Sequence, residues 1–396
     1  MATLAVAALA ACGCASPEAP GPPFRVFVVD LVAIDPATGA GQFELAAREL
    51  TTVTELDALD GPYVRMLRGG ELIEQAGQVT LVGGDAPELR YSVEDGVIVP
   101  LDYPSLVMMS AYYQFERLFE QLPRVAGTTI DELVTDGDKL TVHFEPEGEG
   151  ISGSNAFYVG QRRWVLSRRS SDERVPLATD PRVLAHELGH FLFERSFFDG
   201  VPVACDRTAG HAEPLFPGRL ELEFGVIGFD EGIADFVSFA ATGGTSPLFD
   251  TGFPPGDRDL HSTFTFDELA NGAGCSSGAY CIGTLVARSL FQAMPGLAID
   301  STSADDRGGL SRAVLGALAG ARSRIDPNHL PAPGSPVTEC SSPTGLAASH
   351  DGRVIGSVLE AWLAGLDPVT RAPVCEQLIA SFGELGFPVE ARTACP

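Results

Sequence analysis

Positive charge is scarce in this chain. Lysine occurs once, at Lys139, and 26 basic residues stand against 53 acidic ones, for a formal net charge of -27. Nucleic acid and anionic membrane surfaces repel such a chain, so we expect no nucleic-acid partner and no binding to a membrane through charge. An acidic excess of this size instead keeps an extracellular protein soluble.

Cysteines at the Cys-x-x-Cys spacing of zinc knuckles and thioredoxin-like sites do not occur either. Cys12 and Cys14 lie near the start of the chain, and the other six cysteines form an even set. In an exported protein an even set predicts disulfides, and six cysteines allow fifteen pairings. Nearness in the sequence favours Cys275 with Cys281 and Cys375 with Cys395, which leaves Cys205 with Cys340.

The apolar segment at the N-terminus is too short for a membrane span. Ala2 to Ala11 is about the length of the apolar part of a signal peptide. It runs into Leu9-Ala10-Ala11-Cys12, which resembles the lipobox of bacterial lipoproteins, although no Lys or Arg precedes it. We therefore expect export, with residues 1–23 as a signal and a proline-rich tether. A lipid anchor at Cys12 would be the membrane attachment, and an ordinary secretory signal is the alternative.

Apolar patterns are β-type early in the chain and helical late. This order predicts an α+β fold with two lobes, a β-rich N-terminal lobe and a mainly α-helical C-terminal lobe. The predicted divisions are an accessory or pro-region over 24–101, a lobe over 102–242 that holds the motifs described next, and a helical lobe over 243–396. The predicted strands are 24–29, 78–82, 140–144, 156–159 and 164–167. The predicted helices are 103–122, 284–294, 309–321, 354–363 and 375–382. Two more helices are predicted between these, one that begins at Asp180-Pro181 and one that begins near Asp230 and ends before Gly243.

A metal-binding pattern, His-Glu-Leu-Gly-His, occupies residues 186–190. On a helix, residues four apart share a face, so both imidazoles can reach one metal ion. Glu187 lies one step round the helix, where it can take a proton from a metal-bound water. Leu184 and Phe191 place this helix in a core, where two unpaired histidines would be costly. Two imidazoles and a carboxylate with one open position are typical ligands of catalytic zinc.

A second helix offers the third ligand. Glu231 and Asp235 lie four apart, so they also share a helix face. One carboxylate can bind the metal, while the other accepts a hydrogen bond from a ligand histidine and fixes the orientation of its ring. The alternative is an acidic helix start that faces solvent, where the helix dipole favours Asp and Glu.

The two motifs together resemble the gluzincin peptidases, and specifically the thermolysin and fungalysin families. The residues on which this resemblance rests are HExxH at 186–190 and Glu-x-x-Ala-Asp at 231–235. The resemblance extends upstream to Ser-Asn-Ala-Phe-Tyr at 154–158, a run that in this family places an edge strand along the substrate cleft. It covers residues 103–294, about half of the chain. It implies a two-lobed zincin-type peptidase with the zinc helix between the lobes.

The resemblance also implies roles for individual residues. Asn155 and Ala156 would hydrogen-bond the backbone of a protein or peptide substrate, as in strand addition, with a turn residue as the alternative for Asn155. The remaining implied roles are ligands of one zinc ion at His186, His190 and Glu231, the general base at Glu187, and the hydrogen-bond partner of a ligand histidine at Asp235.

The chain departs from that family in two places. The gap between His190 and Glu231 is longer than in thermolysin and contains Cys205, which indicates an insertion near the site. The family also places an oxyanion-stabilising histidine before a later helix, and Tyr280 stands at the comparable position here. A phenol can donate to an oxyanion, so Tyr280 is the predicted donor, with a packed tyrosine beside a disulfide as the alternative. His261 is the other candidate.

The sequence therefore predicts a secreted zinc endopeptidase that hydrolyses peptide bonds with Glu187 as its general base. One alternative is a pseudopeptidase, a zinc-bearing binding module that has lost catalysis with the oxyanion histidine. Another is a structural lipoprotein of the cell envelope with incidental zinc. The intact Glu187 disfavours the pseudopeptidase, because a non-catalytic site has no use for a base.

Overall fold

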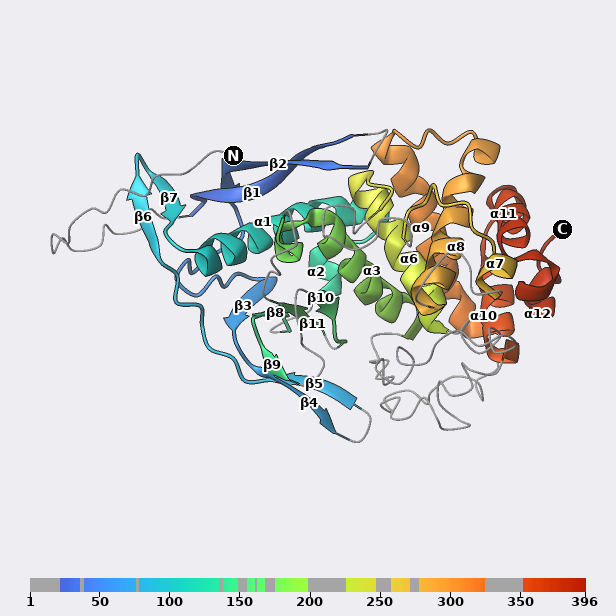
Figure 1. Cartoon of the computed structure of the whole chain (residues 1–396), viewed down its shortest axis with the longest axis horizontal. Helices are drawn as coiled ribbons and strands as arrows, with labels where there is room; N and C mark the ends of the chain where they lie inside the picture. The colour runs from blue at the N-terminus through green and yellow to red at the C-terminus, as the bar shows by residue number, and fades with distance from the viewer. Residues whose placement is uncertain are drawn as a thin grey trace, which may run out of the picture.

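The computed structural model describes residues 22–35, 39–75, 78–134, 138–148, 155–160, 162–167, 175–198, 226–246, 258–270, 278–324 and 352–396. Figure 1 shows the strands gathered on the N-terminal side of the molecule and most of the helices on the C-terminal side. The predicted α+β fold, β-rich first and helical later, is confirmed. None of the helices in the described ranges is long and apolar enough to cross a membrane.

The described strands form three small sheets. The first has the order β2 (Gly41–Leu50), β1 (Phe24–Ile34), β7 (Val97–Pro100) and β6 (Tyr91–Glu94). The second has the order β10 (Ala156–Tyr158), β11 (Arg163–Leu166), β8 (Leu140–Phe144) and β3 (Val64–Arg68). The third joins β5 (Gln78–Val82), β4 (Glu71–Gln75) and β9 (Glu147–Gly148).

The second sheet lies nearest the motif helices. Its central strands β8 and β11 are parallel, with Val142 opposite Trp164, and both of these side chains are fully buried. β10 lies at one edge of this sheet, where it pairs antiparallel with β11. β3 belongs to the same sheet although it comes from the predicted accessory region, and the division at residue 101 stays a prediction.

The helices follow the predicted pattern, most with additional residues at one or both ends. Short 3-10 turns occupy Leu177–Thr179, Pro295–Leu297 and Arg322–Arg324. The α-helices are α1 (Tyr103–Val125), α2 (Ile130–Leu133), α3 (Pro181–Phe198), α6 (Val226–Thr242), α7 (Phe266–Ala270), α8 (Gly278–Ala293), α9 (Ala304–Ala321), α10 (Gly352–Gly365), α11 (Pro368–Gly386) and α12 (Val389–Arg392).

The long helix α1 ties the first sheet to the rest of the molecule (Figure 1). Asp102 caps its N-terminus by accepting the Ser105 N–H at 2.9 Å, which satisfies one of the free donors of the first turn. Further along, Ser110 Oγ accepts the backbone N–H of Val29 in β1 at 2.9 Å. The buried face of α1 and the inner face of β1 contribute to one continuous hydrophobic core.

The motif helices α3 and α6 pack closely against each other. α3 begins after Asp180, whose carboxylate accepts the Arg182 N–H at 2.9 Å, as the predicted helix start requires. At the crossing, a Cβ added to Gly189 would lie 2.5 Å from Ala234 Cα. Small residues therefore let the two helix backbones approach, and this approach brings the motif side chains of both helices together.

The start of α6 differs from the prediction. The helix begins at Val226, before the predicted start near Asp230, because the residues that precede Asp230 continue the apolar pattern. Glu231 therefore lies beyond the first turn. Glu231 and Asp235 are only 6% and 2% exposed, so the alternative of an acidic helix start that faces solvent is wrong.

One predicted disulfide lies within the described ranges. Cys375 in α11 is bonded to Cys395, 20 residues later, as predicted. Cys281 in α8 is also disulfide-bonded. The other cysteines, Cys12, Cys14, Cys205, Cys275 and Cys340, lie outside the described residues, as does the rest of the leader through residue 21.

Candidate metal centre

Three potential ligand atoms from α3 and α6 meet in one buried place. The Nε2 atoms of His186 and His190 are 3.0 Å apart. Glu231 Oε2 lies 3.3 Å from the Nε2 of His186 and 3.7 Å from that of His190. Each of these side chains is less than a tenth exposed. The spacing of both motifs thus results in convergence of the predicted ligand atoms.

These separations fit a tetrahedral metal ion. Zinc binds imidazole nitrogen and carboxylate oxygen at about 2.0–2.2 Å, so neighbouring ligand atoms of a tetrahedron lie roughly 3.3 Å apart. The potential ligand atoms of His186, Glu187 and His190 also lie within 4.8 Å of one another. Glu187 Oε1 is 3.9 Å from His186 Nε2, whereas Glu231 Oε2 is 3.3 Å from it. Glu231 is therefore better placed than Glu187 to complete the ligand set.

Each histidine meets a carboxylate at its other ring nitrogen. His186 Nδ1 lies 2.9 Å from Asp235 Oδ1, and His190 Nδ1 lies 2.9 Å from Asp230 Oδ1. A carboxylate hydrogen-bonded at Nδ1 fixes the tautomer that leaves Nε2 free for a metal and raises the basicity of the ring, and Asp235 is placed to do this for His186. The contact between His190 and Asp230 has the distance of an ion pair but not the geometry of a hydrogen bond. Sequence reasoning missed Asp230 as a neighbour of His190 and treated it as the start of the helix.

Glu187 is held beside the three converging atoms by the edge strand. Its Oε2 accepts the backbone N–H of Tyr158 in β10 at 2.6 Å, and the side chain is buried. The carboxylate thus lies next to the ligand set without being its nearest oxygen. A carboxylate in that position can exchange a proton with a water molecule bound between the histidines.

Arg258 is a further residue of the site that the sequence motifs do not reveal. Its Nη2 donates to Asp235 Oδ1 at 2.7 Å and to Glu231 Oε2 at 3.0 Å, and lies 3.1 Å from His186 Nε2. The guanidinium carbon is 4.7 Å from the ring centre of Tyr280, a cation–π contact. Arg258 is 7% exposed, so its positive charge is held inside the acidic cluster.

The charges of the cluster shift the pKa values of its members. Burial and Arg258 lower the pKa of His186, but Asp235 and Glu231 outweigh them and raise it to about 9. Burial raises the pKa of Glu231, but the positive charges of His190, His186 and Arg258 together bring it well below its usual range. Glu231 thus remains ionised, and its charge favours a cation between the histidines.

The predicted substrate-binding residues are near this centre. Ala156 opens the edge strand β10, which contacts Glu187 through Tyr158. Asn155 is exposed, and its Oδ1 accepts the N–H of Ala156 at 2.9 Å. The placement of β10 at a sheet edge is the one that strand addition by a peptide requires.

The two candidates for the oxyanion donor lie in different places. Tyr280 is in α8, with its ring against Arg258. His261 is exposed and contacts Phe291 edge-on, with ring centres 5.2 Å apart. It lines a cavity whose walls contain none of the residues of the metal centre. The predicted insertion between α3 and α6 lies outside the described residues.

Comparisons with known proteins add little to this picture. No family model matches the chain, and no curated protein matches it either. Among solved structures, the chain is similar to the precursor of protealysin, a metalloproteinase from Serratia proteamaculans. The TM-score is 0.39 and the identity 11%, over 80% of this chain and 86% of that chain. A likeness of that degree assigns no function, which must come from the side chains of the site.

Proposed function

We propose that this protein is an exported zinc endopeptidase that hydrolyses protein or peptide substrates. The observation that supports it most is the convergence of the Nε2 atoms of His186 and His190 on Glu231 Oε2, with separations of 3.0, 3.3 and 3.7 Å. The position of Glu187 beside this set supports hydrolysis in particular. The disulfide between Cys375 and Cys395 supports export, since disulfides persist in oxidising compartments.

In this proposal each residue has a defined task. A zinc ion at this site would polarise the scissile carbonyl and lower the pKa of the attacking water. Glu187, oriented by the Tyr158 N–H, takes a proton from that water and passes it to the leaving amine. Asp235 keeps His186 in the tautomer that binds through Nε2, and the carboxylate of Asp230 faces Nδ1 of His190 at 2.9 Å.

Substrate contacts complete the proposed reaction. The backbone of the substrate would add to β10 near Asn155 and Ala156, which aligns the scissile bond with Glu187. The Tyr280 hydroxyl would donate to the oxyanion as it forms. A lipid anchor at Cys12 would hold the enzyme at the cell envelope, and its absence would leave a freely secreted enzyme.

The experiment that tests this proposal combines metal content with hydrolysis. Purified protein should contain one zinc ion per chain and should degrade casein. A chelator should abolish both, and added zinc should restore both. The Glu231→Ala variant should lose the metal, because two imidazoles alone form a weak site. Zinc-free protein that still degrades casein would overturn the proposal.

Arg258 favours a second candidate, a binding or structural protein of the envelope without catalysis. Its Nη2 bonds both Glu231 and Asp235, so a guanidinium can balance the acidic cluster by itself. In that case purified protein would contain no zinc, and the Arg258→Gln variant would acquire it. Zinc in the unmodified protein together with casein hydrolysis would exclude this candidate.

A further inference from the structure

A cavity outside the metal centre is lined by several arginines. It lies between α1, the end of α6 and the first turn of α9, with a volume of about 330 Å³. Its walls include Arg117 and Arg124 of α1 and Arg307 of α9. In a chain with 26 basic and 53 acidic residues, three arginines at one cavity are a local reversal of charge. The carboxylate in this wall, Asp30, is bonded to Arg48 at 2.7 Å.

Arg307 carries a buried positive charge at this cavity. It is 6% exposed, and its Nη1 donates to the backbone oxygens of Ser301 and Thr302 at 2.9 and 3.0 Å. These acceptors are neutral, and in the described part of the chain Nε has no hydrogen-bond partner and no carboxylate forms an ion pair with the guanidinium. Burial lowers the pKa of Arg307, nearby Arg124 lowers it further, and Asp300 opposes both. The guanidinium carbon also lies 5.4 Å from the ring centre of Phe239, a cation–π contact that offsets part of the cost of burial. An anion would stabilise the buried positive charge further.

Arg124 brings a second guanidinium to the same place. Its Nη2 donates to the Ala241 carbonyl at 3.0 Å, and its Nε is buried without a partner among the described residues. A Cβ added to Gly308, the residue after Arg307, would lie 2.5 Å from Arg124 Cγ. The stem of Arg124 therefore packs directly on α9 beside Arg307.

The N-terminus of α9 adds a further attraction for an anion. Ala304, the first residue of this 18-residue helix, is in the wall of the cavity. The positive end of a helix dipole attracts anions, and its free N–H groups can bond them. Asp305 and Asp306 follow in the first turn, but both are exposed and neither lines the cavity.

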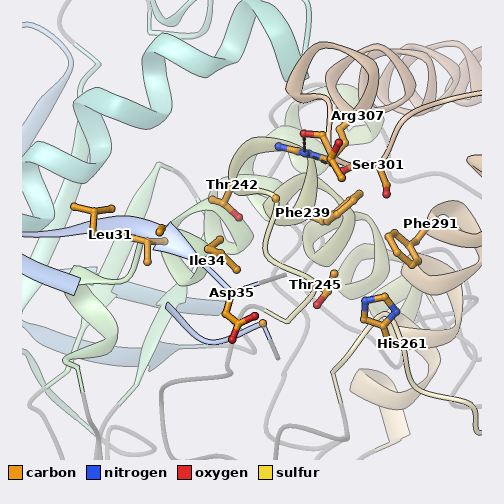
Figure 2. Close-up of a pocket in the computed structure, with 15 residues that line it drawn as sticks. Leu31, Ile34, Asp35, Phe239, Thr242, Thr245, His261, Phe291, Ser301 and Arg307 are labelled. Carbon is orange, nitrogen blue, oxygen red and sulfur yellow. Dashed lines mark hydrogen bonds between the residues drawn. The ribbon is translucent and has the colours of Figure 1, made fainter. Parts of the chain in front are cut away.

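The cavity adjoins a wider one that Figure 2 shows. This second cavity, of about 460 Å³, shares Leu31, Thr242 and Arg307 with the first. Figure 2 shows Arg307 near Phe239, bonded to Ser301, and the apolar walls of the wider cavity include Phe239 and Phe291. A ligand whose acidic group met Arg307 could thus extend an apolar body into the wider cavity.

We propose that the arginine-lined cavity binds an oxyanion of phosphate size, held by Arg307 and Arg124 at the start of α9. The ligand is either free phosphate or the phosphate of a monoester whose body occupies the wider cavity. The site does not depend on the proposed peptidase activity, because neither arginine contacts the residues of the metal centre.

Calorimetric titration of the full-length protein at constant ionic strength tests this proposal. Inorganic phosphate and phenyl phosphate are the probes, and chloride is the control for a salt effect. We expect saturable phosphate binding that chloride does not reproduce. Tighter binding of phenyl phosphate would identify a monoester as the ligand, and equal binding would identify free phosphate. If the heat of titration with phosphate were the same as that with chloride, the proposal would be overturned.

Variants assign the binding to this cavity and not to the metal centre. Arg307→Gln should weaken phosphate binding about tenfold or more, since a charge-assisted hydrogen bond is lost. Arg124→Gln, at a less buried position, should weaken it too and serves if the first variant does not fold. Arg288→Gln is the matched control. Arg288 is 3% exposed and, among the described residues, also donates to carbonyls alone, those of Ser262 and Phe264, but it lines neither cavity. Unchanged affinity in both Arg307→Gln and Arg124→Gln would refute the site.

Discussion

Asp230 and Asp235 approach the two histidines of the metal centre at the same distance, 2.9 Å, yet spacing predicts only Asp235. Asp235 is four residues from Glu231 and therefore on the same helix face, which is what a sequence pattern detects. Asp230 is adjacent to Glu231 in the sequence and therefore lies on a different face of the helix. It reaches His190 because α3 crosses α6 closely at this point, and this crossing is a tertiary feature.

The role of Asp230 can be measured through metal affinity. Asp230→Ala should weaken zinc binding about 10- to 100-fold, because His190 loses the carboxylate that faces its Nδ1 atom at 2.9 Å. Asp230→Asn keeps an oxygen acceptor of the same size and should retain most of the affinity. Competition with a chromogenic chelator measures both. Equal affinity in the unmodified protein and the alanine variant would mean that the Asp230 contact does not support the metal.

No pattern in the sequence identifies Arg258 as a residue of this site. It lies 23 residues beyond Asp235, its hydrogen-bond partner, and no helical or strand period connects the two. The contact exists because the fold places Arg258 against side chains of α3 and α6. Residue types at fixed spacing reveal ligands on one helix, whereas a side chain that arrives from elsewhere needs the fold.

Tyr280 allows a test of the predicted oxyanion donor. Tyr280→Phe keeps the ring against Arg258 and removes only the hydroxyl. If the hydroxyl donates in the transition state, kcat should fall by about two to three orders of magnitude with KM almost unchanged. Steady-state kinetics on a peptide substrate measures both constants. A fully active variant with at most about 1 kcal/mol less stability would assign Tyr280 a packing role.

At the scale of elements, periodicity predicted the helices well and their ends less well. The capped start of α3 at Asp180-Pro181 was predictable because a side-chain cap and a proline mark it locally. The start of α6 was not, since Asp230 and Glu231, which suggest a helix start, in fact lie inside the helix and face the histidines of α3. Local signals fail where a carboxylate within a helix faces a neighbouring helix instead of solvent.

The close crossing of α3 and α6 rests on Gly189. A Cβ there would be 2.5 Å from Ala234 Cα, so Gly189→Ala should force the helices apart. We expect a loss of about 1–3 kcal/mol in unfolding free energy, together with weaker zinc binding, because the proposed ligands lie on both helices. Denaturant unfolding and zinc titration measure the two effects.

Gly316 provides the matched control for that variant. It lies in α9, is exposed, and has nothing within 4 Å of an added Cβ. Gly316→Ala should therefore be neutral or stabilise the helix by up to about 1 kcal/mol. If Gly189→Ala behaved like Gly316→Ala, the α3–α6 contact would not be as close as the account requires.

At the scale of the whole molecule, the fold class was predictable and the sheet pairing was not. Strand positions such as Leu140–Phe144 follow from local composition. The parallel pairing of β8 with β3, 76 residues earlier at Val64 opposite Leu140, depends on a long-range contact that no local pattern encodes. That pairing also places part of the predicted accessory region in the same sheet as β10, the strand that contacts Glu187.

The disulfide between Cys375 and Cys395 was predictable from nearness alone, and its contribution can be measured. The double variant Cys375→Ala, Cys395→Ala should lower the free energy of unfolding by about 2–4 kcal/mol, because the unfolded chain gains freedom when the loop opens. Denaturant titration of both proteins under oxidising conditions gives the difference. Unfolding curves that coincide would show that the bond does not stabilise the C-terminal helices.

The central claim is that Glu187 acts as a base beside a bound zinc ion. Its most direct test is the rate of casein hydrolysis by the Glu187→Gln variant, measured beside the unmodified protein with zinc content matched in both. The amide keeps the shape and the Tyr158 contact but cannot accept the proton, so the rate should fall by about two to four orders of magnitude while zinc stays bound. A zinc-loaded Glu187→Gln variant that hydrolyses casein at the unmodified rate would contradict the account.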